Sequence, residues 1–251
     1  MTTQEFHPSH PFRTPQYSEA DVELDGLTVA YAGQTRMRLT IMSGMSDARV
    51  RIDPGATHLI AIDYGEGTPP RLRVSASEVR VSWPTTIGSW LRAALAGEYR
   101  DVEIVLHPAV EWTLQIRGGL YCFEADLASG KLGQLEISGG VCKAHLDLPA
   151  PRAVVPIRIS GGVSDLSLCR PADAGVALAV SGGISKLRLD DQAFDAIGGG
   201  ARLASGPVNG DVARYAVEIS GGASNLHVGP RRASLGFDAG IDLAARTPFA
   251  G

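Results

Sequence analysis

The sequence has few aromatic side chains and little excess of either charge. Aromatic residues make up 6% of the 251 residues, whereas hydrophobic residues make up 44%. An apolar fraction of this size argues against a wholly disordered chain and predicts a core built mainly from aliphatic side chains. The net charge of −4 argues against a nucleic-acid groove, which needs clustered basic residues. We therefore expect no nucleic-acid partner.

Long apolar runs and a disulfide framework are also missing. No segment approaches the roughly 20 apolar residues that a transmembrane helix needs, so we expect no membrane span. The first residues lack a basic segment followed by an apolar run, which predicts that no secretory signal is present. Three cysteines, an odd number, do not suggest a set of paired disulfides. Together these features favour the cytoplasm.

Glycine, in contrast, is abundant and recurs with a period. Residues 159–168 read Ile-Ser-Gly-Gly-Val-Ser-Asp-Leu-Ser-Leu, and close copies stand at 137–146, 180–189 and 219–228, with a looser one at 116–125. The glycine that opens each pair falls at Gly118, Gly139, Gly161, Gly182 and Gly221. The steps are 21, 22, 21 and 39 residues, and the last is close to two periods. Such regularity is the signature of a repeat architecture.

The first half of the chain carries degenerate copies of the same unit at 41–50 and 72–81. The repeat therefore extends across most of the sequence, which favours one domain over two. We predict a repeat domain over residues 31–228. An N-terminal arm over 1–30 and a C-terminal tail or cap over 229–251 would flank it.

The pattern within the unit predicts its fold. Apolar residues alternate with polar or small ones, which is typical of a strand with one buried face. The alternation slips by one residue after Val163, so we expect a bulge at Ser164–Asp165. One unit cannot bury enough apolar surface to offset its ordering entropy, so each strand should pair with its equivalent in the next coil. The inner column would then hold Phe123, Ala144, Leu166, Leu187 and Leu226.

These inferences predict an all-β, single-domain β-solenoid, a stack of coils of about 21–22 residues. The five recurring glycines would be structural, because they fit a bend where neighbouring backbones approach too closely for a side chain. Alternation alone would also allow an open sandwich of short strands, but the in-phase identity of the copies favours the solenoid.

One helical segment interrupts the strand pattern. Trp90, Leu91 and Leu95 recur at helical spacing within residues 86–97, between a proline and a glycine that would end a helix. We expect a short helix that leaves the stack. It either covers the flank of the solenoid or presents these three side chains to a protein partner.

Residues with catalytic or metal-binding patterns are scarce. No pair of histidines has the spacing of a zinc peptidase, and no CxxC motif exists. His145 and His227 occupy equivalent outward positions and read as a solvated strand face. The Ser-Gly-Gly segments lead into strands rather than helices, so they do not form a phosphate-binding loop. We therefore predict no catalytic residue, no metal ligand and no cofactor.

The recurring Ile-Ser-Gly-Gly-Val-Ser-Asp-Leu unit and the closing segment 215–228 resemble the bacterial adhesin-like, toast-rack β-repeat domains. The resemblance covers about residues 37–228 and implies a non-enzymatic domain without catalytic residues to transfer. Bactofilins, which form β-helical filaments, are a second and weaker comparison, because their coils are shorter than the 21 residues seen here.

The function predicted from the sequence is a non-enzymatic structural or protein-interaction module. Its partner would be another protein or a second copy of the chain, bound through the ends or faces of the stack, because strands at open ends invite further pairing. A glycan-binding or surface-polymer-binding module is the alternative. A carbohydrate-active enzyme, with a site assembled from loops, is the third reading.

Overall fold

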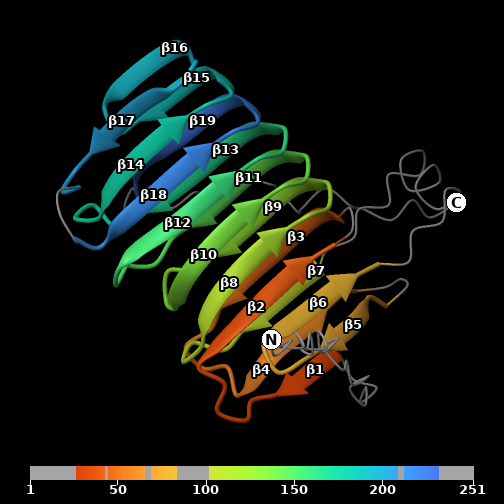
Figure 1. The fold of residues 1–251 in the computed structure, drawn as a ribbon. Coiled ribbons are helices and arrows are strands. Elements are labelled where there is room, and N and C mark those ends of the chain that lie inside the picture. The colour runs from red at the N-terminus through yellow and green to blue at the C-terminus, as the bar shows by residue number, and fades with distance from the viewer. Residues whose placement is uncertain (1–26, 43–44, 66–68, 84–101, 209–211, 232–251) are drawn as a thin grey trace, which may run out of the picture.

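The computed structural model describes residues 27–42, 45–65, 69–83, 102–208 and 212–231. This part of the chain holds nineteen strands and no helix, so the predicted all-β class is confirmed. The strands form two mixed sheets that face each other across one core (Figure 1). The helix expected over 86–97 lies outside the described residues. Strand β1, Leu27–Ala30, falls within the segment that the sequence assigned to an N-terminal arm.

The first sheet has ten strands, in the order β1-β4-β7-β3-β9-β11-β13-β19-β15-β16. Its interior pairs, from β7 to β15, are parallel, and the pairs at both ends are antiparallel. In sequence order its strands are β1, β3 (Met45–Ile52), β4 (His58–Asp63), β7 (Val102–Leu106), β9 (Leu120–Asp126), β11 (Val141–Asp147), β13 (Val163–Arg170), β15 (Gly183–Leu189), β16 (Gln192–Gly198) and β19 (Gly222–Pro230).

The second sheet has nine strands, in the order β17-β14-β18-β12-β10-β8-β2-β6-β5. It too is parallel inside, with one antiparallel pair at each end. Its strands are β2 (Arg36–Ile41), β5 (Arg71–Val74), β6 (Glu78–Ser82), β8 (Glu111–Ile116), β10 (Lys131–Ile137), β12 (Val154–Ile159), β14 (Gly175–Val180), β17 (Ala201–Ser205) and β18 (Arg214–Ile219).

Each Ser-Gly-Gly segment is a corner that carries the chain from one sheet to the other. Strand β12 ends at Ile159 in the nine-stranded sheet, and β13 begins at Val163 in the ten-stranded sheet. Equivalent strands of neighbouring coils lie in register, with Ile137 beside Ile159 and Ala144 beside Leu166. We use "coil" below for two successive strands joined by such a corner.

The coils do not stack in the order of the sequence. The last coil, β18–β19, lies between β12–β13 and β14–β15, and the first, β2–β3, lies between β8–β9 and β6–β7. The expectation that each coil pairs with the next one along the chain is therefore wrong at both ends. The predicted inner column does form, but Leu226 stands between Leu166 and Leu187.

The degenerate copy at 72–81 is not a coil. Its two halves, β5 and β6, pair with each other as an antiparallel hairpin in one sheet, with Leu72 beside Val81. The apparent match to 159–168 arose because a hairpin strand and a coil strand share the same apolar alternation. The hairpin closes the edge of the nine-stranded sheet instead of crossing to the other sheet.

The predicted bulge after each corner is present. Asp165 has φ 53° and is skipped in the pairing of β11 with β13, so the alternation shifts by one residue there. The same left-handed conformation recurs at the equivalent residue of the other coils, with φ between 52° and 59°. These residues are Asp47, Cys122, Lys143, Lys186 and Asn225.

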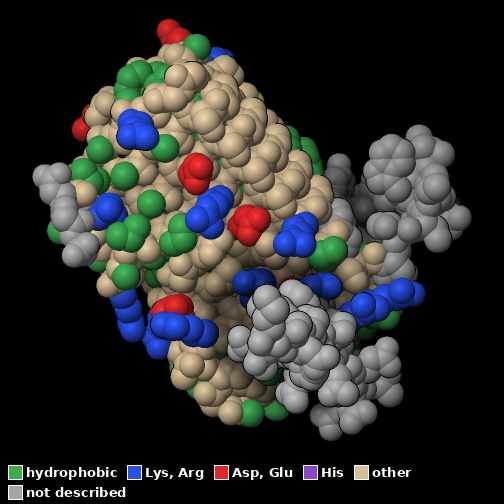
Figure 2. Space-filling model, in the orientation of Figure 1, with side chains coloured by type: hydrophobic (Ala, Val, Ile, Leu, Met, Phe, Trp, Pro, Cys, Tyr) green, Lys and Arg blue, Asp and Glu red, His purple; other side chains and the backbone are tan. Residues whose placement is uncertain are grey.

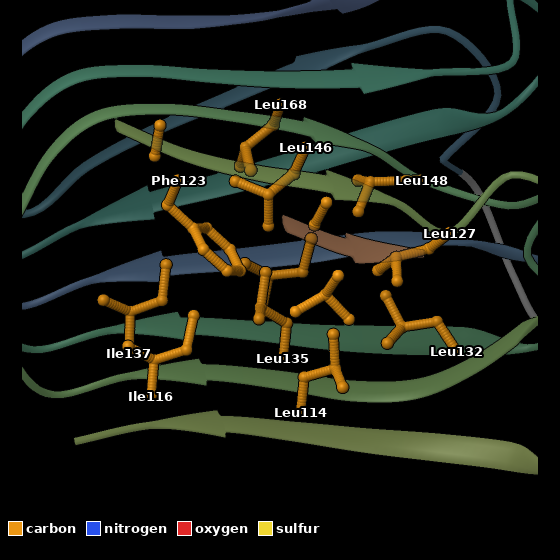
Figure 3. Packing of buried hydrophobic residues seen from close by; sticks show 14 of the residues in the cluster. Leu114, Ile116, Phe123, Leu127, Leu132, Leu135, Ile137, Leu146, Leu148 and Leu168 are labelled. Carbon is orange, nitrogen blue, oxygen red and sulfur yellow. The ribbon is translucent and has the colours of Figure 1, made fainter. Parts of the chain in front are cut away.

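The core is a layer of aliphatic side chains between the sheets. Phe123, Leu146 and Leu168 of the ten-stranded sheet project toward Leu135 and Ile137 of the nine-stranded sheet (Figure 3). All five are almost fully buried. Complete burial of such a side chain contributes roughly 1.5–3 kcal/mol. Stacking of coils therefore supplies the burial that one coil lacks.

Candidate functional site

The opening glycines of the corners form a column in which each backbone lies against the next. A Cβ on Gly161 would lie 2.0 Å from the carbonyl oxygen of Gly139, and one on Gly139 would lie 2.0 Å from that of Gly118. The column continues from Gly161 to Gly221 and from Gly221 to Gly182 in the same manner. No side chain fits between these corners. The five glycines that the sequence singled out therefore lie next to one another, in the order of the stacked coils.

Serine side chains support the corners. The hydroxyls of Ser138, Ser160 and Ser181 each donate to an isoleucine carbonyl of the neighbouring coil, at 3.3–3.5 Å. The result is an edge of the molecule with few large side chains, visible as the tan surface beside the charged face in Figure 2. The serine hydroxyls here donate to backbone carbonyls, and the glycines allow the backbones to approach. This edge therefore offers few side-chain groups for binding or catalysis.

The outer face of the nine-stranded sheet carries charges of both signs. Glu136, Arg158 and Glu218 are successive neighbours across β10, β12 and β18, and red and blue side chains alternate across this face in Figure 2. The exposed pair Arg158–Glu218 has an N–O separation of 3.7 Å. Exposed pairs of this kind contribute little to stability. The alternation gives the face no single-sign field that would attract a polyanion.

The end of the stack made by β16 and β17 is the candidate interaction site. Within the described residues, β16 pairs only with β15 and β17 only with β14, so each sheet ends there in an open strand edge. β16 reads QAFDAIG and β17 reads ARLAS, with one charge each and no proline. Phe194, Ile197 and Leu203 pack against the core but stay partly exposed. This end therefore combines free backbone groups with incompletely covered apolar side chains.

A hollow adjoins this end. It is open to solvent, has a volume of about 370 Å³ and lies over β15, β16 and β19. Lysine, arginine, aspartate and histidine side chains meet there beside a phenylalanine, so a partner would find both polar and apolar contacts. The lining residues include Lys186, Arg188, Phe194, Asp195 and His227.

The sequence did not predict this end. The last step of the glycine series is close to two periods, yet residues 192–205 do not form a further coil and instead turn back as two strands antiparallel to β15 and β14. The signal was present in two short turn pairs, Asp190–Asp191 and Gly199–Gly200, which flank β16. Asp190, Gly199 and Gly200 all have positive φ, as tight reversals require. Trp90, Leu91 and Leu95, the interaction residues predicted from the sequence, lie outside the described residues.

The comparisons with known proteins show the fold. A crystal structure described as a "putative cell adhesion protein" from Clostridium sporogenes superposes with a TM-score of 0.58 at 17% sequence identity. The match covers 86% of this chain and all of the other. No protein-family model and no curated protein matches the sequence. The adhesin-like resemblance thus finds a structural counterpart, while nothing in the comparisons supports the bactofilin one. In the described part of the chain, no helix is long and apolar enough to cross a membrane.

Proposed function

We propose that this protein is a non-enzymatic β-solenoid that acts as a protein-interaction module, and that it binds a second copy of itself through the end formed by β16 and β17. The open edges of both sheets at that end are the observation that carries the proposal. The name of the structurally similar adhesion protein supports an interaction role. The parallel, in-register interior of both sheets supports the solenoid description.

The two ends of the stack differ in how well their edges are protected. At the other end the edge strands β1 and β5 are only four residues long, and β5 carries Arg71 and Arg73. Short strands and positive charges are common devices against edge-to-edge pairing. β16 is seven residues long and carries no positive charge, and β17 is five residues long with Arg202 as its one charge. Pairing is therefore favoured at the β16–β17 end.

Symmetry favours a dimer at this end. A two-fold axis normal to the sheets would set β16 antiparallel to its copy and β17 antiparallel to its copy at the same time. Both sheets would then continue across the interface, and the exposed parts of Phe194, Ile197 and Leu203 would be covered. An isologous contact of this kind closes after two copies, which avoids an endless filament.

The other readings have less support. Glycan-binding faces use aligned exposed aromatics, whereas Tyr121, 39% exposed, is the aromatic among the large exposed hydrophobic side chains of the described residues. A non-enzymatic role and a cytoplasmic location remain part of the proposal. None of the three cysteines, which all lie in the described part of the chain, forms a disulfide, and this supports a reducing compartment. Cell fractionation with an antibody against the chain would test the location.

Light scattering coupled to size exclusion tests self-association. We expect a dimer in the micromolar range, and a monomer for the double variant Ala196→Lys, Ala204→Lys. Both alanines are exposed on the edge strands, and added lysines face their own copies across the two-fold axis.

The control is Ala177→Lys, which adds one lysine one strand inward, at the residue paired with Ala204. It should leave the dimer intact. A wild-type chain that stays monomeric throughout this range would overturn self-association. If the control dissociates as fully as the double variant, the dimer interface does not lie at the β16 and β17 edges.

A further inference from the structure

The outer face of the ten-stranded sheet brings together three side chains that differ in chemistry and in sequence position. His145 and Asp147 lie two residues apart on β11, so they share a face, and Cys169 on β13 is the cross-strand neighbour of Asp147. The donor atoms of the three lie within 4.8 Å of one another. Nε2 of His145 is 3.6 Å from Oδ2 of Asp147.

The three donor atoms are those that zinc prefers: an imidazole nitrogen, a carboxylate oxygen and a thiolate sulfur. Zinc bonds of roughly 2.0–2.3 Å would draw these atoms inward by modest side-chain rotation. Such rotation is open to His145, which is exposed, while Cys169 is sheltered at 8% exposure. We propose that His145, Asp147 and Cys169 bind a divalent transition-metal ion of the zinc class, with a further ligand position left for water.

The surroundings suit this assignment. The Nε of Arg231 donates to Oδ1 of Asp147 at 2.9 Å, and its Nη2 donates to the carbonyl of Leu148 at 3.1 Å. The guanidinium thus fixes the carboxylate and leaves Oδ2, which faces His145, for the metal. Outer-sphere partners of this kind orient metal ligands in many sites. The thiolate and the carboxylate carry two negative charges and the arginine one positive charge. The net negative charge that remains favours a divalent cation.

A second imidazole borders the site on the far side of Cys169. Gly229 on β19 is the cross-strand neighbour of Cys169, and a Cβ there would lie only 3.0 Å from Nε2 of His227. The ring of His227 therefore lies over the glycine, in space that a larger residue would occupy. Donor groups from β11, β13 and β19 thus surround one stretch of the sheet face.

Zinc titration calorimetry of the reduced full-length chain tests the inference. We expect one ion per chain, with affinity lowered more than about 100-fold in His145→Gln and in Cys169→Ser, since loss of a ligand should exceed the 10–100-fold effect of losing an outer-sphere partner. Cobalt bound to the wild type should show thiolate charge-transfer absorption that Cys169→Ser lacks. Because His145 is exposed, His145→Gln is expected to fold normally and keeps the test valid if Cys169→Ser does not fold.

The control is Cys142→Ser, which removes a thiol from the same strand as His145 and should leave the affinity unchanged. Unchanged zinc affinity in His145→Gln would overturn the inference, as would no binding by the wild type. The inference is independent of self-association, because a monomeric chain would still bind the ion.

Discussion

At the scale of single residues, the two glycines of each corner are not equivalent. A Cβ on Gly161 would collide with the carbonyl group of Gly139, whereas a Cβ on Gly162 would meet no atom within 4 Å. Neither has a positive φ, so backbone conformation does not account for the difference. The difference arises from the space that is available between stacked coils.

We therefore predict opposite effects for Gly161→Ala and Gly162→Ala. The first should lower the free energy of unfolding by at least about 1–3 kcal/mol, the cost of overpacking, because rigid backbone cannot yield as a side chain can. The second should be neutral or raise it by about 0.4–1 kcal/mol, because alanine restricts the unfolded chain. Chemical denaturation of both variants measures this. Equal stabilities would contradict the close approach of the backbones.

Residue identity also shows how far the sequence could predict the bulges. Asp165 and Asn225 belong to the types that tolerate left-handed conformations, and the phase slip placed the bulge at Asp165. Lys143 and Lys186 adopt the same conformation although their type does not favour it. Stacking on neighbouring coils imposes the bulge there. The position was therefore predictable from alternation, whereas residue type alone would have missed half the coils.

The metal-ligand cluster could have been found from the period. Asp147 and Cys169 are 22 residues apart, one full period, so a repeat places them side by side. A motif defined by spacing within one segment does not reveal such a cluster, because contacts in a stack join residues one period apart. The sequence predicts a solvated strand face for His145, and its side chain is exposed there.

At the scale of elements, the last coil is held by side chains that reach past its neighbour. The Tyr215 hydroxyl on β18 donates to the carbonyl of Pro149, and Arg231 after β19 binds Asp147 and Leu148. Both thus contact the turn that follows β11. Arg170 on β13 and Asp190 after β15 form a partly buried ion pair at 2.6 Å, which links the two coils that flank β19. The inserted coil is therefore bonded to the turn after β11, and its two neighbours are joined across it.

Tyr215→Phe should lower the free energy of unfolding by about 1–3 kcal/mol, because the buried carbonyl of Pro149 loses its donor.

Burial also raises the pKa of Tyr215, despite the opposing charge of Arg231. Above about pH 10 the unfolded chain releases this proton and the folded chain keeps it, so wild-type stability should fall as pH rises. The variant should lose less stability between about pH 9 and 11. Chemical denaturation at both pH values measures this. If the free energies of unfolding of the wild type and the variant fall equally, the Tyr215 phenol is not buried.

At the scale of the whole molecule, the repeats specify what stacks but not the order of stacking. Leu226 pairs with both Leu166 and Leu187, and every inner position accepts an aliphatic neighbour from any coil. Identical columns therefore fit several orders equally well. The order is set by features outside the repeat, such as the β16–β17 reversal and the Tyr215 and Arg231 contacts. Repeat analysis could predict facing strands and their register, but not the inserted coils.

The insertion makes the end unit, β14 to β17, dependent on the last coil. Without β18–β19, β12 and β14 would no longer be linked within the nine-stranded sheet, nor β13 and β15 within the other. Four strand edges would become open at once. We predict that a chain ending at residue 208 loses amide protection in β14–β17 and melts at a lower temperature than a chain ending at residue 231, which keeps the coil.

Adding a peptide of residues 212–231 to the shorter chain should restore the protection, because the gap between the coils accepts the same in-register strands from outside the chain. A peptide with Tyr215→Phe and Arg231→Gln should restore it less, since it lacks the contacts to the turn after β11. Hydrogen exchange read by mass spectrometry distinguishes these outcomes. If the shorter chain protects β14–β17 as well as the longer one, the end unit folds by itself. The inserted coil would then not be required for the stability of β14–β17.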